Sequence, residues 1–163
     1  MKSIFAPINR ILTLTVILFS SCGGGHDHSG HGHSSGHAHK APHDGLLIEL
    51  GDHAFNLELL FDEQTGTLGA YILGAHAEKY IPIAQKSISL ALSAKGESRK
   101  LELTAVANEL TGETVGNTSY FSGQSDWLKG RHTLSGVLQT VEIAGASFKD
   151  VSFDLSVHHG HAH

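Results

Sequence analysis

The chain contains 163 residues, of which 14 are histidine, and its formal net charge at pH 7 is −5 with the histidines neutral. With 11 basic against 16 acidic side chains, it lacks the positive patch that a nucleic-acid-binding protein needs. No P-loop or H-E-x-x-H pattern occurs either, so the sequence predicts no enzymatic activity and no catalytic residues.

A short basic start leads into an apolar stretch at residues 11–19, which has the length expected for the hydrophobic region of a secretory signal. The letters LFSSC that close this stretch are typical of a bacterial lipoprotein signal, so we expect cleavage before Cys22 and a lipid on its sulfur. A soluble exported protein and an uncleaved membrane anchor are the alternatives. The favoured interpretation makes residues 1–21 a signal peptide and places the mature protein on a membrane of the bacterial cell envelope, held by its lipid.

The next segment, residues 22–43, consists mainly of glycine, serine, alanine and histidine. Such a composition cannot bury enough apolar surface to offset the entropy lost on ordering, so we expect a disordered tether. The sequence also ends on a histidine-rich tail, residues 158–163.

Between these tails, over residues 44–157, apolar and polar residues alternate, and breaks rich in glycine recur about every ten residues. Residues 55–62 are the clearest case, because their apolar positions alternate with positions that include Asn56 and Glu58. Period-two alternation is typical of half-buried antiparallel strands. The sequence therefore predicts an all-β domain, a single antiparallel β-sandwich of the immunoglobulin-like kind with about seven to nine strands.

Several breaks have the composition of hairpin connections, notably residues 62–66 and residues 144–147. Residues 75–85 are interrupted by a proline, so we expect a loop or an edge segment there rather than a helix. The longest irregular region is residues 108–132, and we expect it to be functional or to hide a short strand at residues 119–122.

Residues 42–83 read PHDGLLIELGDHAFNLELLFDEQTGTLGAYILGAHAEKYIPI, with an apolar LEL strand and a Y-x-L-x-x-H segment. This stretch resembles a group of poorly characterised bacterial envelope proteins and adaptor-domain extensions that begin on a His-Gly-Gly motif. Here His43 is followed by Asp44 instead of the first glycine, and Gly74 stands where an acid is common. Genes of that group often lie near heavy-metal efflux systems, so the resemblance implies an accessory role in metal handling.

Histidine is concentrated in the two tails, which hold eleven of the 14 imidazoles. Histidines two residues apart project to the same side of an extended chain, so one pair can offer two nitrogens to one metal ion. With Cys22 lipidated no sulfur ligand remains, which favours Zn(II), Ni(II), Cu(II) or Co(II) over Cu(I). The predicted metal ligands are His26, His28, His31, His33, His37, His39, His43, His158, His159, His161 and His163.

A solvated low-complexity segment is the alternative for both tails, and a cloning remnant is a further alternative for the C-terminal one. Asp27 and Asp44 could add an oxygen ligand, although a solvated charge is the favoured interpretation of both. Because the two ends of a domain commonly emerge close together, joint chelation of one ion by both tails is an additional hypothesis.

Three histidines and one tryptophan lie outside the tails. His76 and Glu78 alternate onto one side of an extended segment and could form a weak metal site, but a hydrogen-bonded or solvated turn is favoured. We expect His53 in a hairpin turn and His132 in a structural role. Trp127, the only tryptophan, is expected to cover one end of the sandwich, with an exposed partner contact as the alternative.

These features predict an envelope lipoprotein that binds divalent transition metal through its histidine-rich tails, as a buffer or as an accessory to metal efflux. The expected mechanism is ligand exchange without turnover. In the alternative function, the sandwich binds an efflux adaptor or another envelope protein through residues 108–132, and the tails are incidental.

Overall fold

The computed structural model describes residues 40–157, so the predicted signal peptide, the lipidated Cys22 and the histidines of residues 26–39 and 158–163 lie outside the described part. Within residues 40–157, no helix is long and apolar enough to cross a bilayer. Eight strands and two helical turns follow one another in this part: β1 (Leu46–Leu50), α1 (Gly51–Ala54), β2 (Phe55–Asp62), β3 (Thr67–Gly74), β4 (Ser87–Ala94), β5 (Glu97–Ala105), β6 (Tyr120–Gln124), η1 (Asp126–Leu128), β7 (Thr133–Ile143) and β8 (Ala146–Ser156).

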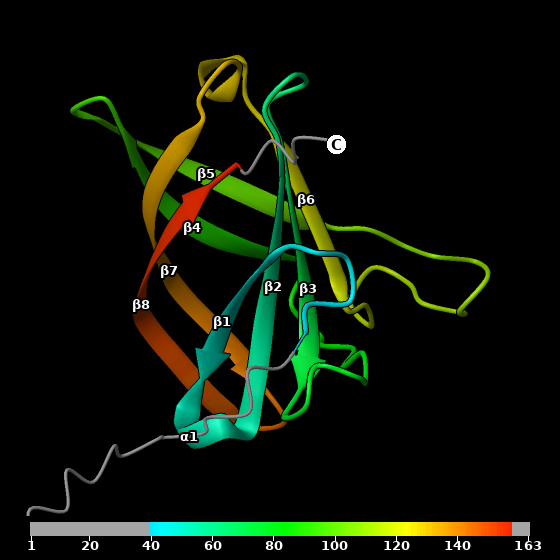
Figure 1. Ribbon diagram of the computed structural model, residues 1–163. Helices are drawn as coiled ribbons and strands as arrows, with labels where there is room; N and C mark the ends of the chain where they lie inside the picture. Colours follow the sequence, from blue (N-terminus) through cyan, green and yellow to red (C-terminus); the bar gives the residue numbers. More distant parts are fainter. Residues whose placement is uncertain (1–39, 158–163) are drawn as a thin grey trace, which may run out of the picture. The chain divides into compact units, whose positions relative to one another are not determined.

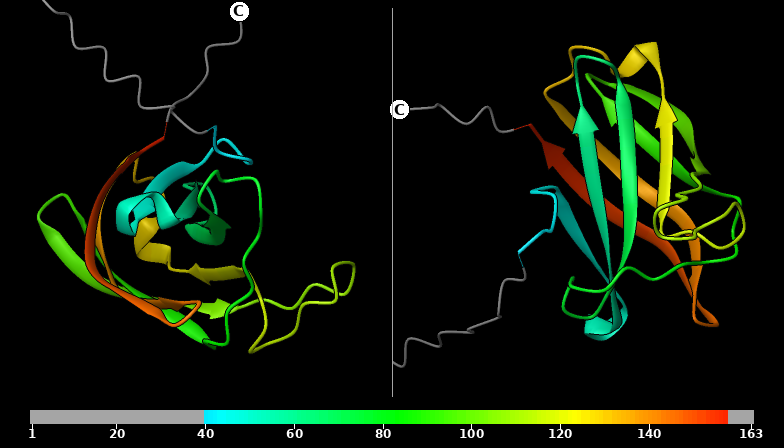
Figure 2. Two further views of the ribbon diagram at one scale, coloured as in Figure 1. Left: turned by 90° about the horizontal axis from the view of Figure 1, so that it is seen from below. Right: turned by 90° about the vertical axis from the view of Figure 1, so that its right-hand side faces the viewer.

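All eight strands belong to one antiparallel sheet with the order β1-β2-β3-β6-β5-β4-β7-β8. The sheet curls until its two edge strands, β1 and β8, lie near each other (Figures 1 and 2). The predicted all-β antiparallel fold is confirmed, and the strand number falls within the predicted range. The shape differs from the expected two-layer sandwich, because the short strand β6 hydrogen-bonds to both β3 and β5 and so joins the two layers into one nearly barrel-like sheet.

Both predicted hairpins are confirmed, since residues 63–66 join β2 to β3 and residues 144–145 join β7 to β8. Ala144 and Gly145 both have positive φ values, 51° and 83°. Two successive residues with positive φ form the turn whose twist matches the twist of antiparallel strands. Lys95 and Gly96, with φ values of 50° and 80°, make the same kind of turn between β4 and β5.

The core fills the inside of the curled sheet with leucine, isoleucine, valine and phenylalanine side chains from every strand. Trp127, in η1, is partly buried and packs against this core, so it covers one end of the sheet as predicted. Its indole N–H donates to Glu97 Oε2 at 2.8 Å, and the guanidinium groups of Arg99 and Arg131 lie 5.5 and 5.3 Å from its ring centroid.

The region predicted to be irregular, residues 108–132, contains strand β6 and the turn η1. The strand expected at residues 119–122 therefore exists, shifted by one or two residues. Residues 106–119, which connect β5 to β6, form a loop that projects from the sheet (Figure 1). Residues 75–85 also form a loop, as expected. One isolated bridge joins this loop to β3, between Tyr80 and Leu73, and a second joins Ile83 to Thr118 in the loop before β6.

Candidate functional site: a histidine held by a buried carboxylate

Glu58, in the middle of β2, is the only acidic or basic residue among residues 40–157 that is fully buried, with 0% of its surface exposed. The neighbouring Leu57 and Leu59 point into the core, so Glu58 lies on the outer face of the sheet. Alternation places Glu58 on the face opposite the core. Its side chain is nevertheless buried, because the segment before β1 folds back over this part of β2.

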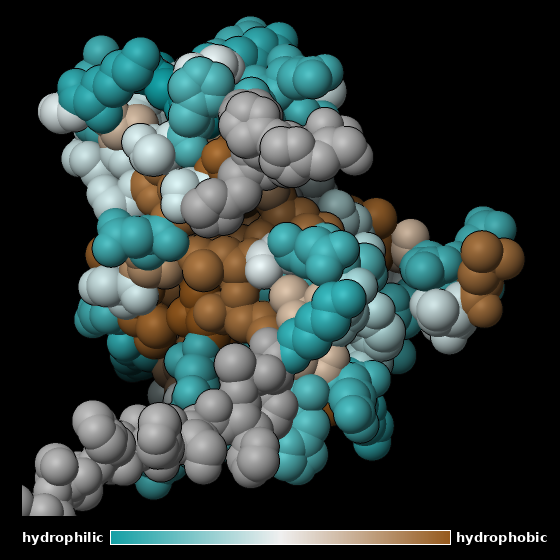
Figure 3. Space-filling model, in the orientation of Figure 1, coloured by the Kyte–Doolittle hydropathy of each residue, from teal (hydrophilic) through white to brown (hydrophobic). Residues whose placement is uncertain are grey.

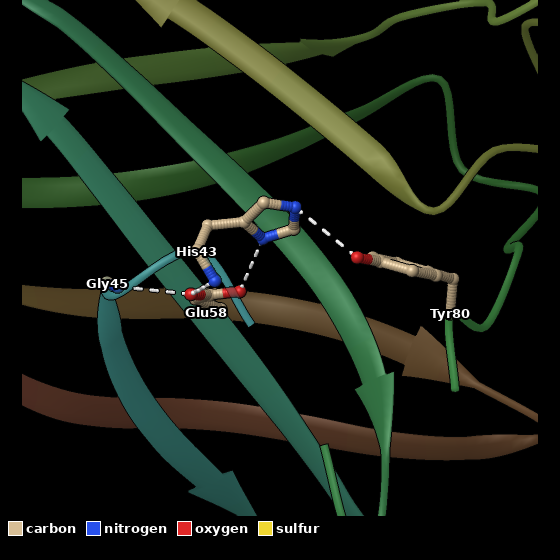
Figure 4. A network of polar contacts seen from close by, with 4 residues as sticks. All are labelled: His43, Gly45, Glu58 and Tyr80. Carbon is tan, nitrogen blue, oxygen red and sulfur yellow. Dashed lines mark hydrogen bonds and ion pairs between the residues drawn. The ribbon is translucent and has the colours of Figure 1, made fainter. Parts of the chain in front are cut away.

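The Glu58 carboxylate accepts three hydrogen bonds from that covering segment (Figure 4). Its Oε1 accepts the backbone N–H of His43 at 2.8 Å and the backbone N–H of Gly45 at 3.1 Å. Its Oε2 lies 2.8 Å from Nδ1 of the His43 ring. Hydrogen bonds to a charged acceptor are stronger than neutral ones, and a buried carboxylate needs such partners to offset its desolvation.

Glycine at position 45 allows the covering segment to approach β2 this closely. A Cβ atom at Gly45 would lie 2.5 Å from the carbonyl oxygen of Leu59 and 2.9 Å from Cγ of Glu58. No side chain fits at the first of these distances, because the obstacle is backbone. The N–H of Gly45 reaches the carboxylate only because residue 45 has no side chain.

The contact with Glu58 decides which nitrogen of His43 is available to a ligand. An ionised carboxylate only accepts hydrogen bonds, so Nδ1 of His43 must carry the proton of this contact. In the neutral ring, Nε2 then carries the lone pair, and it accepts a long hydrogen bond from the hydroxyl of Tyr80 at 3.3 Å. A carboxylate behind one imidazole nitrogen, with the other nitrogen unprotonated, is the usual arrangement of a metal-binding histidine. The His43 side chain is 33% exposed, so a small ion can reach it.

All three tyrosines of the sequence gather around this histidine. The ring of Tyr71, which pairs with Glu58 across β2 and β3, stacks on the ring of His43 with centroids 4.2 Å apart. On its other side Tyr71 stacks on Tyr120 of β6 at 4.4 Å, and Tyr80 meets Tyr71 edge-on at 5.6 Å. We call these five residues, His43, Glu58, Tyr71, Tyr80 and Tyr120, the His43 cluster.

Asn56 lies on β2 two residues before Glu58, and it holds the loop that carries Tyr80 into this cluster. Its side-chain amide is buried and donates to the carbonyl oxygens of Gly74 and Ala75 at 3.0 and 3.1 Å. These bonds hold the turn after β3, and the backbone then returns so that Tyr80 forms a bridge with Leu73. Asn56 and Glu58 together fix the two loops that carry Tyr80 and His43.

The position of Tyr71 predicts a delayed ionisation of one tyrosine. Burial raises the pKa of Tyr71 above its usual value of 10.0, and the neighbouring Tyr120, Tyr80, Glu58 and Glu113 raise it further. Because the protonated phenol is favoured in the fold, this group stabilises the protein fully below about pH 10, and the contribution is lost as the pH rises through the raised pKa. Titration of the ultraviolet absorbance of phenolate should show a late phase that disappears in the Tyr71→Phe variant. If the late phase disappears only in the Tyr120→Phe variant, the tyrosine that ionises late is Tyr120, and the assignment to Tyr71 is wrong.

His43 is the one predicted tail ligand inside the described residues, and the structure places it in the folded domain. The expectation that the tether extends through residue 43 therefore needs correction, because Glu58 and Tyr71 fix this histidine. His76 and Glu78 are exposed in the turn after β3, as the favoured interpretation had it. Within residues 40–157, no group of three or more histidine, cysteine or acidic side chains is placed to hold a metal ion.

The remaining two histidines have the structural roles predicted for them. His53 lies in the turn α1 between β1 and β2 and has a φ of 58°, and its Nδ1 is 2.8 Å from Oε1 of Glu49. His132 lies just before β7, and its Nδ1 is 2.6 Å from Oε2 of Glu63. The side chains of His53 and His132 are 72% and 67% exposed, whereas that of His43 is 33% exposed.

The sequence did not single out Glu58 or the three tyrosines as site residues. A glycine two residues after His43 and an acid within an otherwise apolar strand were the only local signals, and neither identifies its partner. Comparison of the chain with protein-family models, with curated proteins and with solved structures found no match.

Proposed function

We propose that this protein is a lipid-anchored component of the bacterial envelope that binds divalent transition metal ions through its histidine-rich tails and through His43. It would act as a metal buffer or as an accessory to metal efflux. The observation that carries the proposal is the pair of His43 and Glu58, in which a buried carboxylate holds Nδ1 of a partly exposed imidazole and Nε2 makes only a long contact with Tyr80. Ten further histidines in the two tails supply ligands of the same kind.

The proposed mechanism is reversible coordination. An ion arriving at His43 replaces the hydroxyl of Tyr80, whose contact with Nε2 is long at 3.3 Å. Glu58 keeps the ring oriented, as carboxylates behind metal-binding histidines do. Further coordination positions are filled by other imidazoles or by water, and neutral imidazole nitrogen suits Zn(II), Cu(II), Ni(II) and Co(II).

Replacing the ten tail histidines with serine tests this function. The substitutions cover His26, His28, His31, His33, His37, His39, His158, His159, His161 and His163. We expect the number of bound zinc or nickel ions, measured in the presence of a weak competing chelator, to fall from several per chain to about one or fewer. His53→Ser is the matched control, because it removes an exposed imidazole of the folded domain and should change nothing. Full metal occupancy in the serine variant would refute the proposal.

A second candidate function, binding of another envelope protein such as an efflux adaptor, is favoured by one observation. The projecting loop at residues 106–119 exposes 98% of Leu110 and 56% of Val115. The loop is also held in shape, because Asn108 pairs with Glu113 and the carboxylate of Glu113 accepts from the N–H and hydroxyl of Ser119. An ordered loop with apolar residues at its surface is suited to docking.

For this second function, the chain with Leu110→Ser and Val115→Ser should fold normally and lose the capture of an efflux adaptor in a binding assay. The paired control is Thr111→Ser, which changes the same loop without altering its polarity. Capture that survives the double substitution and disappears with the tail histidines would exclude the loop as the docking site.

A further inference from the structure

The segment that carries His43 runs beside the gap between the edge strands β1 and β8, where apolar side chains reach the surface (Figure 3). Asp44 and Gly45, the next two residues, line a hollow of about 320 Å³ in this gap together with Val157. The backbone N–H groups of His43 and Gly45 both donate to the Glu58 carboxylate. Because the chain is tied to the sheet on both sides of Asp44, the fold fixes the backbone of His43.

The hydroxyl of Tyr80 points toward Nε2 of His43 from a different part of the chain (Figure 4). Tyr80 belongs to the loop between β3 and β4, and it forms a bridge with Leu73 of β3. Its ring meets the ring of Tyr71 edge-on with centroids 5.6 Å apart, and the ring of Tyr71 also stacks on His43 at 4.2 Å. One tyrosine therefore packs against both rings and keeps Nε2 and the hydroxyl facing each other.

The distance between Nε2 and this hydroxyl oxygen is that of two ligands on one tetrahedral ion. The two atoms lie 3.3 Å apart, whereas an ordinary hydrogen bond is about 2.5–3.2 Å long. Zinc binds imidazole nitrogen and protein oxygen at about 2.0–2.2 Å, so at the tetrahedral angle two such ligands are about 3.3–3.5 Å apart. An ion that takes the place of the hydroxyl at Nε2 can therefore bind the same oxygen with little movement of either side chain.

We propose that Nε2 of His43 and the side-chain oxygen of Tyr80 coordinate one Zn(II) ion together, with Tyr80 as a phenolate. This inference rests on the proposed function and adds to it the second ligand of the His43 site. On binding, the O–H bond of Tyr80 breaks, an oxygen–zinc bond forms and the proton passes to solvent, while zinc keeps its oxidation state. A bound metal ion promotes this step, as it releases protons from coordinated water and thiols.

The charges around the two ligands suit a divalent ion. Glu58 is fully buried and contributes one negative charge, and the phenolate of Tyr80 contributes a second, so together they balance the charge of zinc. Nδ1 of His43 keeps its proton and its contact with Glu58, so the imidazole binds the ion as a neutral ring. The side chain of His43 is 33% exposed and Tyr80 is 42% exposed. The remaining positions of the ion are therefore open to water or to further imidazoles, which allows the ion to exchange.

Ultraviolet difference absorbance during a zinc titration tests this site, because zinc itself does not absorb and phenolate absorbs at longer wavelengths than phenol. The starting protein is the full chain with its ten tail histidines replaced by serine, so that the tails do not take up the ion. We expect one tyrosine per chain to become phenolate at neutral pH as zinc binds. Tyr80→Phe removes only the hydroxyl, and it should abolish this signal and weaken zinc binding by on the order of 10-fold.

Tyr120→Phe is the matched control, because it removes the hydroxyl of a tyrosine whose ring stacks on Tyr71 instead of facing Nε2. This variant should keep both the phenolate signal and the zinc affinity. His43→Gln should lose the signal although Tyr80 keeps its hydroxyl, because the phenolate alone does not hold the ion.

The outcomes separate this inference from the function on which it rests. Zinc that binds without a phenolate signal, or with the same affinity in Tyr80→Phe, would overturn the joint site and leave binding by histidine intact. A signal that persists in Tyr80→Phe and disappears in Tyr120→Phe would identify another tyrosine as the ligand and would also overturn it. The same holds if the chain without tail histidines binds no zinc while the unsubstituted chain does. If the unsubstituted chain binds no zinc, the proposed function itself is wrong.

Discussion

Replacing Glu58 with glutamine is expected to lower the free energy of unfolding by about 3 kcal/mol, the largest effect we foresee for a single substitution. The carboxylate offers two acceptor oxygens to three N–H groups, whereas the glutamine amide offers one oxygen and one NH₂ group. Either one N–H group loses its partner, or the His43 ring takes the other tautomer and the charge-assisted hydrogen bonds are replaced by weaker neutral ones. Chemical denaturation followed by tyrosine and tryptophan fluorescence measures the change.

Glu49→Gln is the matched control for this prediction. Glu49 lies on the adjacent strand β1 and also pairs with a histidine, His53, at 2.8 Å, but its side chain is 48% exposed. Exposed pairs of this kind contribute about 0–1 kcal/mol, so the control should stay close to the unsubstituted protein. Equal and small losses for Glu58→Gln and Glu49→Gln would mean that the buried carboxylate does not hold the segment before β1.

The second large effect concerns pH. Metal affinity is expected to fall by on the order of 100-fold between about pH 7.5 and about pH 5.5, because each imidazole must lose a proton before it can bind an ion. An ordinary histidine has a pKa of about 6.5, so at the lower pH roughly nine rings in ten are protonated. Each ligand then contributes about a tenfold loss, and two ligands per ion give the stated factor.

Isothermal titration with Zn(II) at several pH values measures this dependence, with the affinity corrected for competition by the buffer. The sign follows from the ligand chemistry, since binding is strongest above the imidazole pKa and weakens as the pH falls through it. An affinity that does not change over this range would point to carboxylate or backbone oxygen ligands, and would contradict binding by histidine.

The strand pattern illustrates how far the sequence determines the fold. Apolar residues at every second position of β4 and of the second half of β8, residues 151–155, identified these strands, because alternate side chains of a strand point to opposite faces. The turn composition likewise identified the hairpins at residues 63–66 and residues 144–145. The pairing of β6 with both β3 and β5 could not be predicted, because it joins residues far apart in the sequence and a five-residue strand has a weak pattern.

The candidate site, in contrast to the strands, depended mostly on the tertiary structure. Composition alone drew attention to histidine, and the prediction that the tails hold metal ligands needs no tertiary structure. The role of Glu58 arises only because the segment before β1 covers the outer face of β2. Alternation assigns a residue to one face of a strand, but it does not say whether another segment later covers that face.

The sequence by itself determined that this protein has an all-β domain flanked by histidine-rich segments, because alternation and composition are local properties of the chain. Only the tertiary structure decided that His43 belongs to the folded domain, that its Nδ1 faces Glu58, and that Asp44 and Val157 line one hollow between β1 and β8. The curling of a single sheet brings these distant residues together, and that curling depends on strand pairings that no local pattern specifies.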